Sequence, residues 1–172
     1  MLHTAILVYM EYISPYLAMF DPLTFVFLKG LGISLVLGYA MGAERELRGK
    51  DAGISTHIFV IAGSMLFTVL SMMVDPASTT RISAQIVSGI GFLGAGLIIK
   101  EGLGVRNLTT AASLWFSAAV GMTIGYGYYA IAIISGISAV FIPRIRHFKE
   151  EPFEERDKAI APIKKKARKI KS

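Results

Sequence analysis

The run from Ile82 to Ile99 constrains the fold more than any other part of this sequence. It holds 18 residues without a formal charge and lies between Arg81 and Lys100. A helix needs roughly 20 apolar residues to cross a hydrocarbon core about 30 Å thick. Because a water-soluble domain of this size rarely contains such a run, we interpret it as a membrane span.

Four further apolar runs are long enough to cross a membrane. Backbone groups in lipid need partners within their own segment, so each run is predicted to be helical. The hydrophobic share of 53% exceeds that of ordinary soluble domains and agrees with this class. We therefore predict an all-α, polytopic transmembrane helix bundle in residues 21–143, with five spans at 23–43, 57–74, 82–99, 109–124 and 127–142.

Residues 1–20 are open to two interpretations. Wound as a helix, this segment gathers its polar residues and a proline on one face: His3, Thr4, Glu11, Ser14 and Pro15. That face predicts an amphipathic helix lying in the membrane interface. The alternative is a sixth span, interrupted by Glu11 and Pro15. The segment lacks a basic n-region and a clear cleavage site, so we expect it to remain in the mature protein.

The basic residues predict the orientation of the chain in the membrane. Segments 44–56 and 100–108 and the tail 144–172 carry most of them, and five alternating spans bring all three segments to one side. The positive-inside rule makes that side cytoplasmic, which places the N-terminus outside and the C-terminus inside.

The basic tail, residues 144–172, holds the entire net charge of +6, because residues 1–143 are neutral in sum. It is predicted to act as a topology determinant, or more specifically to bind anionic lipid headgroups. It has only Phe148 and Phe153 as aromatic partners and no recognisable module, so we expect no nucleic acid binding.

Glycines are dense in the predicted spans. Gly89, Gly91 and Gly94 match a GxGxxG pattern, but the pattern lies in a lipid-length run and not between a strand and a helix. Small residues let membrane helices approach closely, so we predict helix packing, with a narrow cavity or hinge as the alternative. The predicted packing glycines are Gly38, Gly42, Gly89, Gly91, Gly94, Gly96 and Gly121. Because the third span carries small residues on almost all of its faces, we predict that other helices contact it on several sides and that it is the central helix.

A shift of 54 residues aligns the chain weakly with itself. Asp21-Pro22 falls on Asp75-Pro76, Ser34 on Ser88, and Gly42 on Gly96. This pattern predicts a parallel hairpin repeat, in which hairpins 23–74 and 77–124 are related by an axis along the membrane normal.

Polar residues near the span ends are candidates for a functional seam through the bundle. Arg48 lies one turn after Glu44 and can pair with it, either as an interfacial anchor or within the seam. Hydroxyl pairs Ser55-Thr56 and Thr109-Thr110 are predicted to cap the helices that follow. Lys29 is predicted to extend outward to the headgroups. The candidate seam residues are Glu44, Arg45, Arg48, Arg81, Gln85, Arg106, Thr109 and Thr110.

The sequence lacks the residue patterns that metal sites and several classes of enzyme require. The chain has no cysteine, and His3, His57 and His147 are far apart with no HExxH pair, so we expect no metal site. No nucleophile elbow, Walker loop or kinase pattern occurs. We therefore expect no cofactor and no enzymatic activity.

Three segments together resemble the MgtC/SapB membrane domain: GAERELRGKDAGISTH, RISAQIVSGIGFLGAGLIIKEG and VRNLTTAASLW. The resemblance covers residues 23–143. It implies a prokaryotic inner-membrane protein, linked in some lineages to growth at low magnesium, survival inside host cells and restraint of an F-type ATP synthase. The matching polar or small positions are Glu44, Arg45, Arg48, Gly53, Thr56, Arg81, Gln85, Arg106, Thr110 and Trp115.

The chain also departs from the family pattern. Ser55 stands where the family often has arginine, and Asn107 stands where it has glycine. The helix N-termini at these two corners are predicted, as an alternative to capping alone, to hold an anion at the cytoplasmic face, and the two departures weaken that alternative. Longer members add a soluble ACT-like domain, whereas the basic tail follows here.

We expect a non-enzymatic regulator of magnesium-linked ion homeostasis or membrane energetics. It would act through contacts with the lipid bilayer and another membrane complex, such as an F-type ATP synthase, or as a homo-oligomer. The alternative is a small-solute or ion transporter that uses Glu44, Arg45, Arg81 and Gln85. No acidic residue lies in the middle of a span, which disfavours a dedicated magnesium site.

Overall fold

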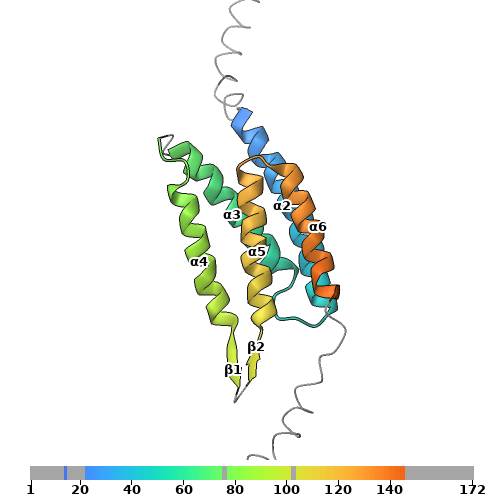
Figure 1. The fold of residues 1–172 in the computed structure, drawn as a ribbon. Coiled ribbons are helices and arrows are strands. Elements are labelled where there is room, and N and C mark those ends of the chain that lie inside the picture. Colours follow the sequence, from blue (N-terminus) through green and yellow to red (C-terminus); the bar gives the residue numbers. More distant parts are fainter. Residues whose placement is uncertain (1–13, 15–21, 75–76, 102–103, 146–172) are drawn as a thin grey trace, which may run out of the picture. The chain divides into compact units, whose positions relative to one another are not determined.

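The computed structural model describes residues 14, 22–74, 77–101 and 104–145. Five helices make up most of this part of the chain (Figure 1): α2 (Pro22–Leu47), α3 (Ile54–Val74), α4 (Arg81–Leu97), α5 (Leu108–Gly125) and α6 (Tyr129–Ile145). The strands β1 (Ile99–Glu101) and β2 (Gly104–Arg106) connect α4 to α5. Apart from Ser14, the predicted interfacial helix lies outside the described residues, and so does nearly all of the basic tail.

Each of the five predicted spans is a helix, so the all-α class is confirmed. Three helices are long and apolar enough to cross a membrane: Thr24–Leu47, Ile54–Val74 and Leu108–Gly125. Helices α4 and α6 are apolar but have 17 residues each. The chain is therefore a helical protein with three long candidate spans, and the five-span count stays a prediction.

The end of the third predicted span differs from the prediction. Helix α4 ends at Leu97 instead of Ile99, because Ile98 takes an extended conformation with φ −77° and ψ 113°. Ile99 then pairs with Arg106 in an antiparallel ladder that includes Lys100 and Val105. β-branched residues favour such pairing over a continued helix.

Helix α3 is the centre of the bundle, and the prediction that α4 would be central is wrong. Figure 1 shows α3 and α5 between the outer helices, with α4 on one side. Helix α3 packs against α2, α4 and α5, whereas α4 packs chiefly against α3 and α5. The main apolar core lies where α2, α3, α5 and α6 meet, and consists of Leu37, Met41, Ile61, Met65, Val69, Val120, Ile124 and Ala132.

The glycines explain why α3 is central. A Cβ atom on Gly38 or Gly42 of α2 would meet the backbone of Ile58 or Ile54, and one on Gly121 would meet the carbonyl of Ile61. The backbones of α2 and α5 thus approach α3 so closely that a side chain at these three positions has no room, as predicted for these glycines.

The glycines of α4 behave differently. A Cβ on Gly94 would make an ordinary contact with Ala111 at 3.6 Å. Among the described residues, no atom lies within 4 Å of a Cβ built on Gly89, Gly91 or Gly96. The prediction that these three glycines pack against another helix is therefore wrong within this part of the chain.

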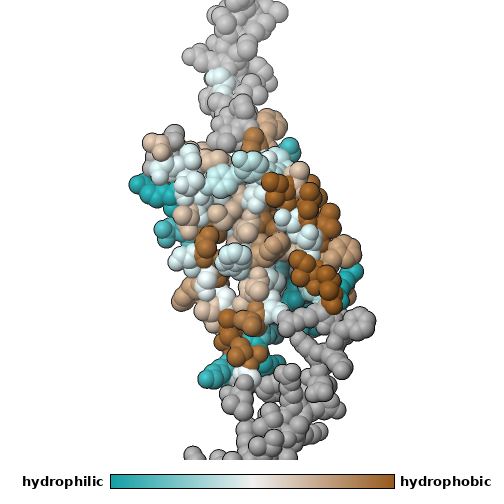
Figure 2. All heavy atoms as spheres, in the orientation of Figure 1, coloured by the Kyte–Doolittle hydropathy of each residue, from teal (hydrophilic) through white to brown (hydrophobic). Residues whose placement is uncertain are grey.

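The surface of the helices is apolar. Large hydrophobic side chains on α6 point outward, with exposed fractions between 42% and 66% for Ile131, Ile133, Ile134 and Ile137. Figure 2 shows hydrophobic residues gathered over this helix and near the two strands. Exposed apolar area of this extent suits lipid rather than water.

The chain divides into two units after Val140. The second unit begins at Phe141, and its described part is the last turn of α6. There the guanidinium of Arg144 lies 5.6 Å from the centroid of the Phe141 ring.

Candidate functional site

Glu44 and Arg45 point into the interior of the bundle at the C-terminal end of α2. Their exposed fractions are 4% and 3%. Helix α2 continues to Leu47, so these two residues follow Leu37 and Met41 on the buried face at helical spacing. Buried charges cost several kcal/mol each, by a rough estimate, unless they are paired and hydrogen bonded. The stability of the bundle therefore depends on the hydrogen bonds and ion pairs that Glu44 and Arg45 make.

Two hydrogen bonds compensate the buried charges in part. Arg45 donates from Nη2 to Oγ1 of Thr110 at 2.9 Å, which joins α2 to α5. Arg48 donates from Nη1 to Oε1 of Glu44 at 3.2 Å, as predicted from their spacing. Thr110 is fully buried at the start of α5.

His57 completes this cluster from α3. Its side chain is fully buried, and its Nδ1 lies 2.9 Å from the carbonyl oxygen of Gly53. Because a carbonyl only accepts, Nδ1 donates, and the neutral ring then carries a lone pair on Nε2. His57 also interacts electrostatically with Glu44 and Arg45. We call Glu44, Arg45, Arg48, His57 and Thr110 the charged cluster.

Sequence reasoning missed His57 as a site residue. It was considered only as a metal ligand, and its distance from other histidines argued against that role. An ionisable residue inside a predicted span is nonetheless a functional candidate by default, and this signal was available. Its neighbours were not, because Arg45 and Thr110 are 65 residues apart in the chain.

Within the described residues, three buried polar atoms of the charged cluster have no hydrogen-bond partner. They are Oε2 of Glu44, Nε of Arg45 and Nε2 of His57. Buried polar groups in native proteins are normally satisfied, so each exception requires an explanation.

The predicted seam is not continuous. The structure brings together Glu44, Arg45, Arg48 and Thr110, and it leaves Arg81, Gln85, Arg106 and Thr109 exposed. Arg81 begins α4, whose first turns contact the C-terminal end of α5, whereas Thr110 lies at the N-terminal end of α5. The two groups of polar residues therefore lie at opposite ends of α5.

Hydroxyl groups hold the start of α4 at that far end. Ser71 on α3 donates to the carbonyl oxygen of Thr79 at 2.7 Å and accepts from the backbone N–H groups of Ile82 and Ser83. The hydroxyl of Ser83 lies 2.5 Å from that of Tyr126 at the end of α5. A side chain of another helix thus satisfies the first N–H groups of α4.

The predicted hydroxyl caps are wrong. Helix α3 begins at Ile54, before Ser55, and its first N–H donates to Oε1 of Glu46 at 2.9 Å. Helix α5 follows Asn107, whose side chain makes no cap bond and instead donates to Asp51. Asn107 has φ 63°, a conformation that asparagine and glycine tolerate best. This conformation explains why asparagine can replace the glycine that the family often has at this position.

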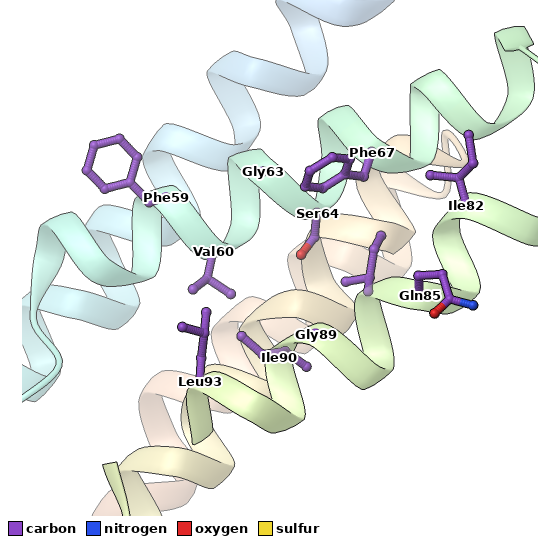
Figure 3. Close-up of a pocket in the computed structure, with 11 residues that line it drawn as sticks. Phe59, Val60, Gly63, Ser64, Phe67, Ile82, Gln85, Gly89, Ile90 and Leu93 are labelled. Carbon is purple, nitrogen blue, oxygen red and sulfur yellow. The ribbon is translucent and has the colours of Figure 1, made fainter. Parts of the chain in front are cut away.

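A groove of about 480 Å³ lies between α3 and α4. Figure 3 shows Phe59, Val60 and Phe67 on one side and Ile90 and Leu93 on the other. Ser64 and Gln85 are the polar residues among those that line it, so the groove is mainly apolar.

Lys29 is exposed and contacts the first residue of α6, and its extension to the headgroups stays a prediction. Its Nζ lies 4.2 Å from the centroid of the Tyr129 ring. This cation–π contact joins α2 to α6.

Apolar helices of spanning length, with a charged cluster buried at their ends, define a multi-pass membrane protein. Among known families, the model of the MgtC family matches residues 31–151. The chain therefore belongs to the MgtC family, and its resemblance to the family's membrane domain is confirmed.

Three relatives illustrate the similarity. Protein MgtC of Salmonella typhimurium strain LT2 is 46% identical over 115 residues, which are 67% of this chain and 50% of the relative. Protein MgtC of Brucella abortus strain 2308 is 46% identical over 110 residues, 63% of this chain and 46% of the relative. An uncharacterized protein of Synechocystis is 47% identical over 108 residues, 62% of this chain and 46% of the relative.

The chain spans about half the length of the curated relatives that it matches. No solved structure matches the chain at a significant level.

Proposed function

We propose that this protein is a non-enzymatic regulator of magnesium-linked ion homeostasis or membrane energetics, which acts by binding another membrane complex through α4. The observation that carries the proposal is the exposed face of this helix. Ala84, Ser88, Gly91 and Ala95 follow one another at three- and four-residue spacing, and all four are exposed. This stripe defines the α4 face.

The physics of helix association in lipid supports this role. Lipid tails are as apolar as leucine, so helices associate through close backbone packing and hydrogen bonds between side chains. The open backbone at Gly91 permits such packing, and exposed Gln85 adds a polar group at membrane depth. A partner helix would cover both.

The partner is the part of the proposal that rests on family resemblance. An F-type ATP synthase is the first complex to test, and a second copy of this chain is the alternative. The orientation with the N-terminus outside a prokaryotic inner membrane also belongs to the proposal.

The experiment is affinity purification of the full chain from membranes of a host that carries an F-type ATP synthase, after cross-linking from the α4 face. Gly91→Leu fills the open backbone and is expected to reduce the recovered complex. Gly32→Leu on α2 is the matched control, because Gly32 is also exposed with no described atom near its Cβ position. Equal recovery with both variants would refute the proposal.

Ion transport is the second candidate function, because ionisable residues buried in a membrane helix bundle, here Glu44 and Arg45, are functional candidates by default. The same cluster disfavours a dedicated magnesium site. Its one carboxylate, Glu44, lies beside two arginines, and no group of three potential metal-ligating side chains occurs in the described ranges. A magnesium site normally needs more oxygen ligands than this. Cation uptake by protein in liposomes that is lost in Glu44→Gln would support transport over regulation.

A further inference from the structure

Two glycines make room for the groove between α3 and α4. On α3, Gly63 lies between Phe59 and Phe67 at four-residue spacing, so one face of this helix carries a ring, a gap and a second ring. Gly89 lines the groove from the facing helix α4, as Figure 3 shows. No described atom lies within 4 Å of a Cβ atom built on either glycine. The space between the two helices is therefore open at both positions.

The groove has an apolar floor and exposed walls. Ser64 and Ile90 are buried at its base, whereas Phe59, Phe67 and Leu93 have exposed fractions of 77%, 54% and 53%. No lining residue carries a formal charge. A water molecule needs two to four polar partners, which this lining does not supply. In a membrane helix bundle, an open hollow of this kind is suited to hydrocarbon.

The length of the groove matches one leaflet of a bilayer. At a rise of about 1.5 Å per residue, the lining extends about 16 Å along α4 from Ile82 to Leu93 and about 12 Å along α3 from Phe59 to Phe67. Half of a hydrocarbon core about 30 Å thick is about 15 Å. A single helical turn, about 10–12 Å wide and 5.4 Å high, already has a volume on the order of 500 Å³. The groove of about 480 Å³ therefore fits one acyl chain better than a membrane-spanning helix.

Two polar side chains continue this side of α4 toward the start of the helix. Arg81, Gln85 and Gly89 follow one another at four-residue spacing, so they share one face of α4. Arg81 is exposed, and its guanidinium has five N–H donors, so it can bind a phosphate in addition to other partners. The amide of Gln85 has two hydrogens, so one can bind an ester carbonyl while the other stays available to a partner on the α4 face.

We propose that the groove between α3 and α4 binds one acyl chain of an anionic phospholipid, whose phosphate is bound by Arg81 and whose ester carbonyl accepts from Gln85. Phosphate, ester and acyl chain follow one another in a phospholipid in the same order as their binding groups along α4. Gly89 lies about 200° around the helix from Gly91 of the α4 face. The lipid site is therefore independent of the partner proposed for that face.

Photolabelling tests the position of the acyl chain. The full chain, freed of lipid in dodecyl maltoside micelles, is titrated with phosphatidylglycerol that carries a diazirine in the middle of one acyl chain, and labelled peptides are mapped by mass spectrometry. We expect saturable labelling around Phe59, Phe67 and Leu93, whereas labelling of the exposed Ile134 on α6 should rise in proportion to the probe. Labelling that does not saturate at either surface would overturn the site, and so would a groove left unlabelled because a second copy of the chain covers it.

Filling the groove tests the role of the two glycines. Gly63→Leu and Gly89→Leu each place a side chain in open space, and leucine has a high helix propensity, so the fold should be retained. Half-saturation of the groove should then need about tenfold more probe, the effect of excluding about two methylene groups. Gly91→Leu is the matched control on the opposite side of α4 and should leave labelling unchanged. Unaltered labelling in both groove variants would contradict the proposal, as would an equal loss in the control.

Headgroup selectivity tests the contact with Arg81. Arg81→Gln should raise the half-saturating amount of the phosphatidylglycerol probe about fivefold, as expected for loss of one basic residue that attracts an anionic lipid. A diacylglycerol with the same labelled chain has no phosphate, so its binding should not change in this variant. Equal half-saturation of the unaltered protein by the two probes would overturn the assignment of an anionic phospholipid.

Discussion

Helices α5 and α4 both carry glycines at membrane-packing spacing, yet the structure uses them in different ways. On α5, Gly121 lies against the backbone of α3, so a side chain has no room. On α4, Gly91 faces outward with no described atom near its Cβ position. The spacing of the glycines therefore predicts close helix packing, but it does not show whether the packed helix belongs to the same protein or to a partner.

The charged cluster adds a second contrast. The α2–α3–α5 core contains buried charges that hold its helices in one arrangement, whereas α4 is attached to it mainly by hydroxyl groups at one end and by Ile90 and Gly94 further along. Changes in the core should therefore cost more stability than changes in α4. Four experiments test this comparison, in order of decreasing expected effect.

Replacement of Glu44 by Ala should have the largest effect. It removes the buried carboxylate that accepts from Arg48 and that precedes buried Arg45 in the chain, and loss of one partner in a buried charge pair costs about 3–5 kcal/mol. The measurement is reversible unfolding in mixed detergent micelles. Glu46→Gln serves as the control, and a loss below about 1 kcal/mol, the range of exposed pairs, would contradict burial of the pair.

The glycine contrast itself predicts the second effect. Gly121→Ala should destabilise the protein by about 1–3 kcal/mol, because the new methyl group overpacks against the carbonyl of Ile61. Gly91→Ala should be neutral or slightly stabilising in the same unfolding assay, since alanine has the higher helix propensity. Similar losses in both variants would show that α4 is covered in the isolated protein.

The attachment of α4 predicts a smaller effect. Ser71→Ala removes the acceptor for the N–H groups of Ile82 and Ser83, and loss of a capping side chain typically costs about 1 kcal/mol. Hydrogen exchange should increase at the start of α4 and remain unchanged in α5. Equal increases in both helices would mean that α4 is part of the same cooperative core.

Replacement of Lys29 should cause the smallest loss of stability. Lys29→Gln removes the cation above the Tyr129 ring, and exposed contacts of this kind contribute about 0.5–1 kcal/mol. Tyr129→Leu should cause a loss of similar size, and the double variant should lose no more than either one. Additive losses would show that the two side chains do not interact.

Much of the fold followed from local patterns. Long apolar runs predicted every described helix, because membrane length and backbone satisfaction leave few other structures. The i,i+4 spacing of Glu44 and Arg48 predicted their ion pair, which the structure contains. The parallel hairpin repeat stays a prediction, although the aligned glycines Gly42 and Gly96 have different surroundings.

The site was less predictable. Thr110 was expected to cap its own helix, but its hydroxyl accepts from Arg45 on α2. Ser71 was not selected at all, although it caps α4 from α3. Capping rules consider neighbours in sequence, whereas a packed bundle offers partners from other helices.

The sequence by itself determined that this chain is an all-helical membrane protein of the MgtC family, because composition, run length and motif are properties of the chain alone. Only the tertiary structure decided that α3 is central, that α4 has an open face, and that His57 joins Glu44 and Arg45. These facts depend on which helix faces come into contact. Small residues permit contact on several faces, and the packing of the whole bundle selects among them.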